Sequence, residues 1–192
     1  MNNREFDYAY GVLTGQVDNN LLTDYNNNPT RDVIFDGILQ QLKPNPINVF
    51  QVGAIETFRA DWRLGSGWSD IIFGKYIKEY GGKLTIADIN LDHLANSSLA
   101  SSSLDYDINI IYGNAVDHIG DMGYNHIYYL DGSNDPKETL DQLNSIAHKN
   151  CTVIVDDFSI KGTLLPEEFV NEGYVHNVAN GVGVFRLGEA DD

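Results

Sequence analysis

Hydrophobic and polar positions along the chain follow two alternating patterns. Short apolar runs of strand length recur at 47–53, 84–88, 107–112, 126–131 and 152–157. Between most of these runs, apolar residues return every three or four positions, as they do on one face of a helix. This second pattern predicts helices between Thr30 and Pro44 and over 68–80, 91–101, 136–146 and 166–171. The Ser-rich stretch after 101 is expected to be a loop.

Two more β segments follow, at 174–179 and 182–187, on either side of Asn180-Gly181. This dipeptide is typical of a tight hairpin, whose two strands are antiparallel. Strands that alternate with helices, in contrast, form parallel sheets. The sequence therefore predicts a Rossmann-like α/β fold. We expect an open, mostly parallel, seven-stranded sheet with a terminal antiparallel hairpin and helices on both faces.

The length of 192 residues suits a single domain, and a hydrophobic content of 42% is enough for a buried core. We expect this single domain to span 30–192. Residues 1–29 are rich in Asn, Asp and Tyr. We expect this N-terminal segment either to cover a substrate or to form an interface, for example in a homodimer.

The net charge of the chain excludes some classes of binding partner. Twelve basic and 28 acidic residues give a formal net charge of −16. Nucleic acids and anionic membrane surfaces are therefore not expected as partners, because they bind basic surfaces. No apolar run of about 18 residues is present, so no membrane span is expected. The single cysteine, Cys151, excludes an internal disulfide, and the first residues lack a signal-peptide pattern, so we expect a cytoplasmic protein.

Polar residues stand where four of the five predicted parallel strands end. They are Asp88, Asn114, Asp131 and the pair Asp156-Asp157. Ligands of open α/β sheets bind beyond these carboxyl ends. A carboxylate such as Asp88 can accept hydrogen bonds from both hydroxyls of a ribose. The same residue types also form turns and helix caps, so a purely structural role is an alternative for each of them.

The most specific group of candidate metal ligands consists of Asp131, Asp156 and Asp157. If the strands that they end are neighbours, the carboxylates lie about 5 Å apart and repel one another. A hard cation such as Mg²⁺ or Ca²⁺ would relieve that repulsion. The alternative is that one Asp caps a helix while another faces solvent. Zinc is not expected, because the five histidines show no paired motif; His118 alone is a candidate to line the cleft.

Six motifs follow one another along the chain. They are VFQVG (49–53), GSGWS (65–69), ADIN (87–90), YGNAVD (112–117), IYYLDGSND (127–135) and VIVDD (153–157). Their order resembles a class I S-adenosylmethionine-dependent methyltransferase, and the resemblance covers about residues 30–188, which form the expected methyltransferase-like domain. The chain is most similar to the class 24-type enzymes and more distantly to those of the catechol O-methyltransferase type.

The resemblance implies the cofactor S-adenosylmethionine and a set of residues that contact it. Asp88 would bind the ribose, with Ile89 beside it, and Asn114 and Ala115 would border the adenine. The first loop would pass the methionine part and Asp131 would lie nearby. The residues that this assigns to the first loop are Gly53, Ala54, Glu56, Ser66, Gly67 and Ser69.

The resemblance also implies roles for residues around the reacting groups. In metal-dependent relatives, Mg²⁺ binds the positions that are Asp131, Asp156 and Asp157 here. The family's His or Lys three residues after the first of these is Asn134, which cannot accept a proton at neutral pH. Two alternatives stay open: either Asp135 or His118 is the general base, or metal coordination lowers the pKa of the substrate hydroxyl enough to compensate for the missing base. The candidate catalytic residues are Asp131, Asn134, Asp135 and His118.

Two functions follow from this sequence. The first is methylation of an oxygen on a small hydroxylated molecule, with S-adenosylmethionine as cofactor and with or without assistance from Mg²⁺. The second is a non-catalytic binding protein on the same scaffold, because Gln51 and Asn134 replace the family's acidic and basic residues. A nicotinamide-dependent oxidoreductase is disfavoured, since G-x-G-x-x-G does not follow the first strand.

Overall fold

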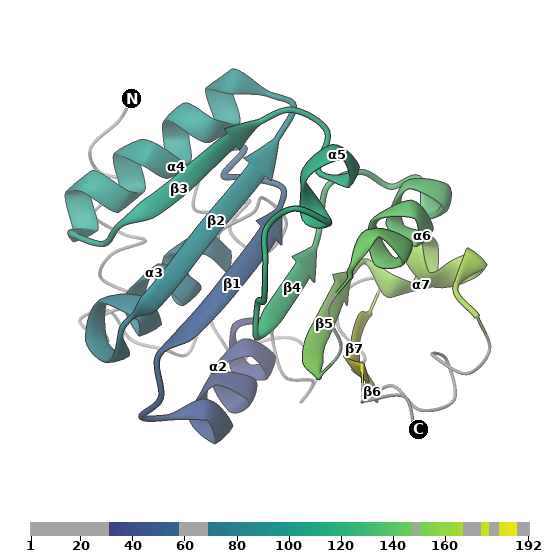
Figure 1. Ribbon diagram of the computed structural model, residues 1–192, viewed down its shortest axis with the longest axis horizontal. Helices are drawn as coiled ribbons and strands as arrows, with labels where there is room; N and C mark the ends of the chain where they lie inside the picture. Colours follow the sequence, from purple (N-terminus) through teal and green to yellow (C-terminus); the bar gives the residue numbers. More distant parts are fainter. Residues whose placement is uncertain (1–30, 58–68, 148–149, 167–173, 177–180, 188–192) are drawn as a thin grey trace.

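The computed structural model describes residues 31–57, 69–147, 150–166, 174–176 and 181–187 (Figure 1). Its strands are β1 (Ile47–Val52), β2 (Gly82–Asp88), β3 (Ile108–Tyr112), β4 (Ile127–Leu130), β5 (Cys151–Asp156), β6 (Tyr174–His176) and β7 (Val182–Leu187). They form one sheet in the order β3-β2-β1-β4-β5-β7-β6. Strands β1 to β5 pair in parallel, and β7 runs antiparallel to β5 and β6. The expected mostly parallel sheet with an antiparallel end is confirmed.

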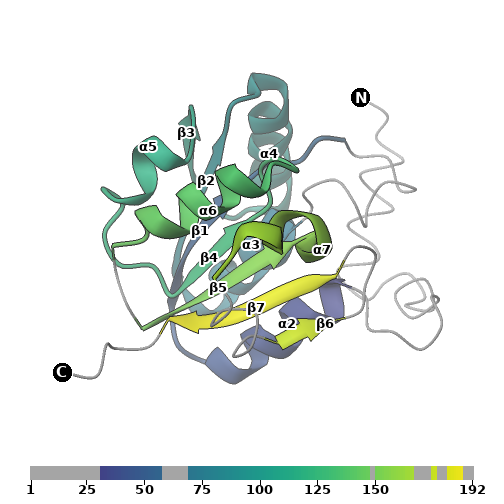
Figure 2. The ribbon, with the colours of Figure 1, turned by 90° about the vertical axis from the view of Figure 1, so that its right-hand side faces the viewer.

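Helices cover both faces of this sheet, as expected (Figures 1 and 2). One face carries α2 (Arg31–Leu42), α3 (Ser69–Tyr80) and α4 (Leu91–Leu104). The other carries α5 (Val116–Ile119), α6 (Pro136–Ser145) and α7 (Phe158–Lys161), with a 3-10 turn, η3 (Gly162–Leu164), directly after α7. Within the described residues, no helix is both long enough and apolar enough to cross a membrane.

Each central strand contributes to two hydrophobic cores, one on either face of the sheet. In β4, Ile127 and Tyr129 pack in the core beneath α2 and α3, whereas Tyr128 and Leu130 pack in the core beneath α5 and α6. All four side chains of β4 are at most 1% exposed. A parallel strand covered on both faces is expected to read as a continuous apolar run, as the sequence does here.

The strand order reverses between β1 and β4. From β1 the chain proceeds outward through β2 to β3 at the edge of the sheet, and it then returns to place β4 on the other side of β1. Val52 and Leu130, the last residues of the two strands, are partners in the register. Loops that leave two such strands diverge to opposite faces of the sheet, which makes this end a ligand site in open α/β sheets.

The prediction of a loop after 101 is wrong. Helix α4 continues to Leu104, where Asp105 ends it in a left-handed conformation with φ 60°. Ser97 and Ser101 are buried, and the Ser101 hydroxyl donates to the carbonyl of Tyr106. Hydroxyls that bond to nearby backbone can be buried inside a helix, so a Ser-rich composition alone did not distinguish the two states.

Two short helices, α5 and α7, were not predicted from the sequence. Each has four residues, which is too short for a helical period to be recognised. Five other predicted features lie wholly or partly outside the described residues: the N-terminal segment 1–29, the Thr30 cap, the helix over 166–171, the strand over 174–179 and Asn180 in the hairpin turn. The strands on either side of that turn do pair antiparallel, with His176 opposite Val182.

A buried carboxyl group stands in the first turn of α3. Asp70 is 0% exposed, and its two oxygens have no hydrogen-bond partner of good geometry among the residues that the structure describes. Burial raises the pKa of Asp70 from 3.8 to about 7, and the nearby Ser97 hydroxyl and Ile71 amide lower the pKa only in part. The native state therefore retains a proton that the unfolded chain has already released near pH 4.

Because of that proton, the free energy of unfolding should fall as pH rises from about 4 to 7. The size of the fall should be roughly 2 to 4 kcal/mol. Asp70→Asn, which mimics the protonated acid, should unfold at the wild-type urea concentration near pH 4 and at a higher concentration at pH 8. Asp107→Asn, at an exposed carboxylate, should follow the wild type at both. If the free energies of unfolding of the wild type and Asp70→Asn changed with pH in parallel, the raised pKa of Asp70 would be contradicted.

Candidate functional site

A pocket of about 210 Å³ lies at the carboxyl ends of the strands, where the strand order reverses. It is bordered by the segments that follow β1, β2, β4 and β5. The lining residues are Gly53, Ala54, Glu56, Asp88, His93, Asp131, Gly132, Asn134, Asp157 and Lys161. Several strand-end residues that are far apart in the sequence, Asp88, Asp131 and Asp157, therefore meet in one place.

Gly53 brings the first loop against the end of β4. Its φ of 92° lies in the left-handed region, which favours glycine. A Cβ atom at this position would lie 2.5 Å from the carbonyl oxygen of Asp131. The buried side chain of Gln51 also reaches this loop, because its Nε2 donates to the Gly53 carbonyl at 2.7 Å. The close approach makes one continuous pocket out of two strand ends.

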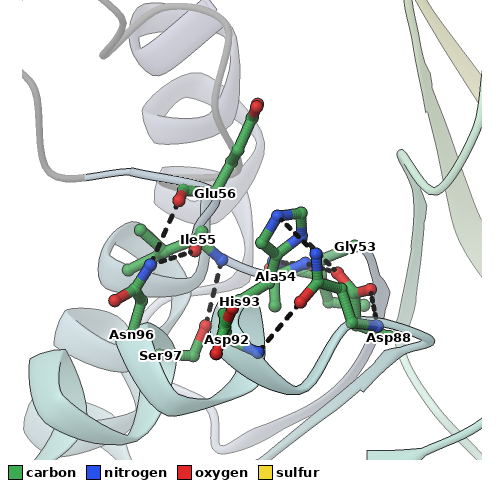
Figure 3. A network of polar contacts seen from close by, with 11 residues as sticks. Gly53, Ala54, Ile55, Glu56, Asp88, Asp92, His93, Asn96 and Ser97 are labelled. Atoms are coloured by element: carbon green, nitrogen blue, oxygen red, sulfur yellow. Dashed lines mark hydrogen bonds and ion pairs between the residues drawn. The ribbon is translucent and has the colours of Figure 1, made fainter.

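Asp88 fixes the loops after β1 and β2 to each other (Figure 3). Its Oδ2 accepts a hydrogen bond from the Ala54 amide at 2.9 Å, and its Oδ1 accepts one from the Asn90 amide at 2.8 Å. Nδ1 of His93 lies 3.3 Å from Oδ2. The Asp88 side chain remains 10% exposed, and Oδ1, with one hydrogen bond from the Asn90 amide, has a second lone pair. The group therefore keeps acceptor capacity toward the pocket.

Helix α4 holds the rest of the first loop in place. The Ile55 amide donates to the Ser97 hydroxyl at 3.1 Å. Nδ2 of Asn96 donates to the carbonyls of Ile55 and Glu56, at 3.0 and 3.1 Å (Figure 3). The Glu56 side chain is exposed and lines the pocket. These bonds define the path of residues 53–56 without a glycine-rich sequence there.

Tyr129 links the carboxylates at the ends of β4 and β5. Its hydroxyl lies 3.0 Å from Oδ2 of Asp131 and 2.9 Å from Oδ2 of Asp156. Asp156 is 2% exposed, and its Oδ1 accepts a hydrogen bond from the Asp157 amide at 2.9 Å. The expectation that Asp131 and Asp156 converge is thus met, but a phenol stands between them.

A lysine side chain completes this end of the pocket. Nζ of Lys161, at the end of α7, lies 2.6 Å from Oδ1 of Asp131 and 3.8 Å from Oδ2 of Asp157. The Lys161 side chain is only 3% exposed. Asp157 itself has φ 48°, a left-handed conformation that is uncommon outside glycine. The positive charge therefore stands between two of the three carboxylates.

The predicted Mg²⁺ site does not fit these residues. Mg²⁺ binds its oxygen ligands at about 2.1 Å, and the Lys161 ammonium already lies between Asp131 and Asp157. A divalent cation bound there would be repelled by this ammonium. Among the described residues, no group of three or more His, Cys, Asp or Glu side chains is arranged to hold a metal ion. The carboxylates alone predicted a metal site, because the strand pattern does not reveal the lysine that neutralises them.

Three solved structures with a similar fold have low sequence identity to this chain. The SAH-bound methyltransferase PaMTH1 from Podospora anserina has 11% identity and a TM-score of 0.62, over 96% of this chain and 88% of its own. Cofactor-bound Rv0187 from MTB has 11% identity and a TM-score of 0.63, over 98% and 92%. The MycE methyltransferase of mycinamycin biosynthesis, in complex with Mg and SAH, has 14% identity and a TM-score of 0.54, over 83% and 49%.

The chain has the Rossmann-like methyltransferase fold. No family model matches it, and no curated protein does. At these identities the likeness establishes the fold alone. The pocket of this methyltransferase fold must therefore be judged by its own residues.

The adenine-side candidates lie around the ends of β2 and β3, near the pocket but not among its lining residues. Ile89 directly follows Asp88 and is 72% exposed. Asn114 is exposed, and its Oδ1 accepts a hydrogen bond from the Val116 amide at 3.1 Å at the start of α5. Ala115 is buried, and His118 lies on α5 beside Gly113. In these positions Asn114 has a clear structural role as a turn residue.

The remaining candidates are placed as follows. Asn134 lines the pocket, whereas Asp135 caps α6, where its Oδ1 accepts from the Lys137 amide at 2.9 Å. Ser69 is buried at the start of α3. Ser66 and Gly67 lie outside the described residues.

Three residues of the site, Lys161, Tyr129 and His93, were not predicted from the sequence. Lys161 follows Asp157 by four residues, which is the spacing of an ion pair on one helical face. That signal is present in DDFSIK but needs the short helix α7 to be recognised. The apolar pattern places Tyr129 among the strand residues of the core, and its hydroxyl nevertheless has a polar function.

The contact at Gly53 gives a direct test of the pocket's construction. Gly53→Ala should lower the free energy of unfolding by roughly 2 to 3 kcal/mol, because of its positive φ and the clash with Asp131. Gly37→Ala is the matched control, since Gly37 lies in α2 and a Cβ atom added there would have nothing within 4 Å. It should instead stabilise by about 0.5 to 1 kcal/mol. Urea unfolding followed by circular dichroism measures both; an unchanged Gly53→Ala would contradict the contact.

Proposed function

We propose that this protein is an S-adenosylmethionine-dependent methyltransferase that acts on an oxygen of a small hydroxylated molecule. The observation that carries the proposal is the position of Asp88. Its carboxylate ends β2, is fixed by two backbone amides and lines a pocket that continues to Asp131. A preorganised acceptor at this place suits the two hydroxyls of a ribose.

The residues present fit an adenosine-containing cofactor. Gly53 lines the pocket, and its positive φ lets the first loop turn there against the end of β4. The exposed apolar side chain of Ile89 would lose contact with water against an adenine ring. Ala54 and Glu56 border the pocket between these points and would face the methionine part.

When bound, S-adenosylmethionine supplies a methyl group on a sulfonium centre. The chain's task is then to hold the acceptor oxygen in line with that methyl group and to exclude water. Asp131, Asn134 and Asp157 line the end of the pocket opposite Asp88 and would contact the acceptor. Asp157 is 31% exposed and lines the pocket, and its carboxylate would accept the proton of the acceptor hydroxyl.

A non-catalytic binding protein with the same fold is the second candidate. It is favoured by Asn134, which lines the pocket but cannot act as a base at neutral pH. The two candidates share cofactor binding and differ only in methyl transfer.

Cofactor binding can be measured by calorimetric titration of S-adenosylhomocysteine (SAH) into the full chain. The wild type should bind in the micromolar range. Asp88→Asn should weaken binding by roughly tenfold or more, because one charged acceptor is lost. Asp92→Asn, at an exposed carboxylate on the first turn of α4, should bind like the wild type. Equal affinities for wild type and Asp88→Asn would refute the role of Asp88, provided that both have the same circular dichroism spectrum.

Methyl transfer can be screened with radiolabelled S-adenosylmethionine and a panel of small phenols, sugars and amines. We expect labelled product from hydroxylated acceptors, with the methyl group on oxygen by mass spectrometry. Product from amines alone would contradict the acceptor class. SAH binding without product from any acceptor would favour the non-catalytic candidate.

A further inference from the structure

Three carboxylates lie at the ends of β4 and β5, in a partly buried site. Asp131, Asp156 and Asp157 all converge there, and Asp156 is 2% exposed. Uncompensated carboxylates at such short range repel one another, and their burial adds a cost of desolvation. Tyr129 supplies a hydrogen bond but no charge. The compensating charge that the described residues bring to this cluster is the ammonium group of Lys161.

Lys161 is held in this position by the packing of α7. The ring of Phe158, at the start of the same short helix, packs against Gly162 and Gly183. A Cβ atom at Gly162 or Gly183 would lie 2.4 or 2.5 Å from that ring. The Phe158 amide also donates to the Gly181 carbonyl at 3.0 Å, which ties α7 to the start of β7. The lysine is therefore fixed by the fold before any ligand arrives.

The ammonium group retains a donor for a ligand. It carries three N–H bonds, of which one is directed to Asp131 at 2.6 Å. Asp157, at 3.8 Å, is in ion-pair range but beyond hydrogen-bond distance. Lys161 is also one of the residues that line the pocket. A directional donor with a full positive charge thus borders the end of the pocket opposite Asp88.

We propose that Lys161 takes the place of a divalent cation in this pocket. Its ammonium holds Asp131 and Asp157 together and offers an N–H to the oxygen of the methyl acceptor, so that acceptor binding needs no metal ion. This inference rests on the proposed methyltransferase function. It differs from the expectation of a Mg²⁺ site in making the cation part of the chain.

The test measures Mn²⁺ binding to the full chain by electron paramagnetic resonance, in which the signal of free Mn²⁺ is lost on binding. Lys161→Gln should bind Mn²⁺ at least tenfold more tightly than the wild type, because it exposes a carboxylate cluster without its resident cation. Asp131→Asn, added to Lys161→Gln, should abolish that gain. Lys137→Gln is the matched control, since Lys137 forms an exposed i,i+4 pair with Asp141; it should bind Mn²⁺ like the wild type.

Two results would overturn the proposal. One is a wild-type Mn²⁺ site that is lost in Asp131→Asn, and the other is no gain in Lys161→Gln. If Lys161→Gln fails to fold, the comparison of wild type with Asp131→Asn decides alone, and equal weak binding supports the proposal. With an acceptor from the screen, methyl transfer should be the same in EDTA as in Mg²⁺, and a requirement for Mg²⁺ would also overturn it.

Failure of the cofactor proposal would be seen separately. SAH titration into the wild type in EDTA tests whether the cofactor binds, and it does not depend on Lys161 or on Mn²⁺. Absence of SAH binding would refute the methyltransferase. The Mn²⁺ results would still report whether Lys161 keeps metal ions from the carboxylates.

Discussion

The ends of β1 and β4 touch, and the candidate site depends on this contact. Gly53 turns beyond β1 so close to the Asp131 carbonyl that the backbone leaves no room for a side chain. The contact joins the part of the pocket formed by Asp88 to the part formed by Asp157 and Lys161. An open parallel sheet offers such a place where its strand order reverses. The topology therefore decides which polar strand ends become neighbours.

The two ends of the pocket balance their negative charge by different means. Asp88 accepts hydrogen bonds from two backbone amides, which carry only partial charges, and it keeps free acceptor capacity. Asp131 instead faces a full positive charge on a buried lysine. The first arrangement suits hydroxyl donors such as those of a ribose. The second leaves a charged N–H donor for an oxygen, so the pocket offers acceptors at one end and a donor at the other.

Much of this organisation was readable in the sequence. The apolar runs predicted β1 to β5, and the turn signal at Asn180-Gly181 predicted the antiparallel end of the sheet. The position of Asp88 at the end of a parallel strand agrees with its place in the lining of the pocket. These inferences succeeded because they rest on local periodicity and on a topological rule that holds for open α/β sheets in general.

The prediction of a loop after 101 failed because Ser is found in both loops and helices. Helix α4 continues to Leu104, with Ser97 and Ser101 on its buried side and the Ser101 hydroxyl bonded to the carbonyl of Tyr106. Asp135 caps α6, and its role as a general base stays a prediction. In both cases the residue type allowed two roles, and the local sequence did not choose between them.

The sequence by itself determined the fold class, the end of the sheet at which a ligand would bind and the acidic character of that end. Only the tertiary structure decided what those acids do. Asp131 and Lys161 are 30 residues apart in the chain, and their ion pair exists because β4 and β5 are neighbours and α7 folds back over them. Electrostatic energy depends on the distance between charges in the folded chain, and the apolar pattern of the strands does not reveal that distance. The same carboxylates that predicted a metal site therefore form a lysine site in the folded protein.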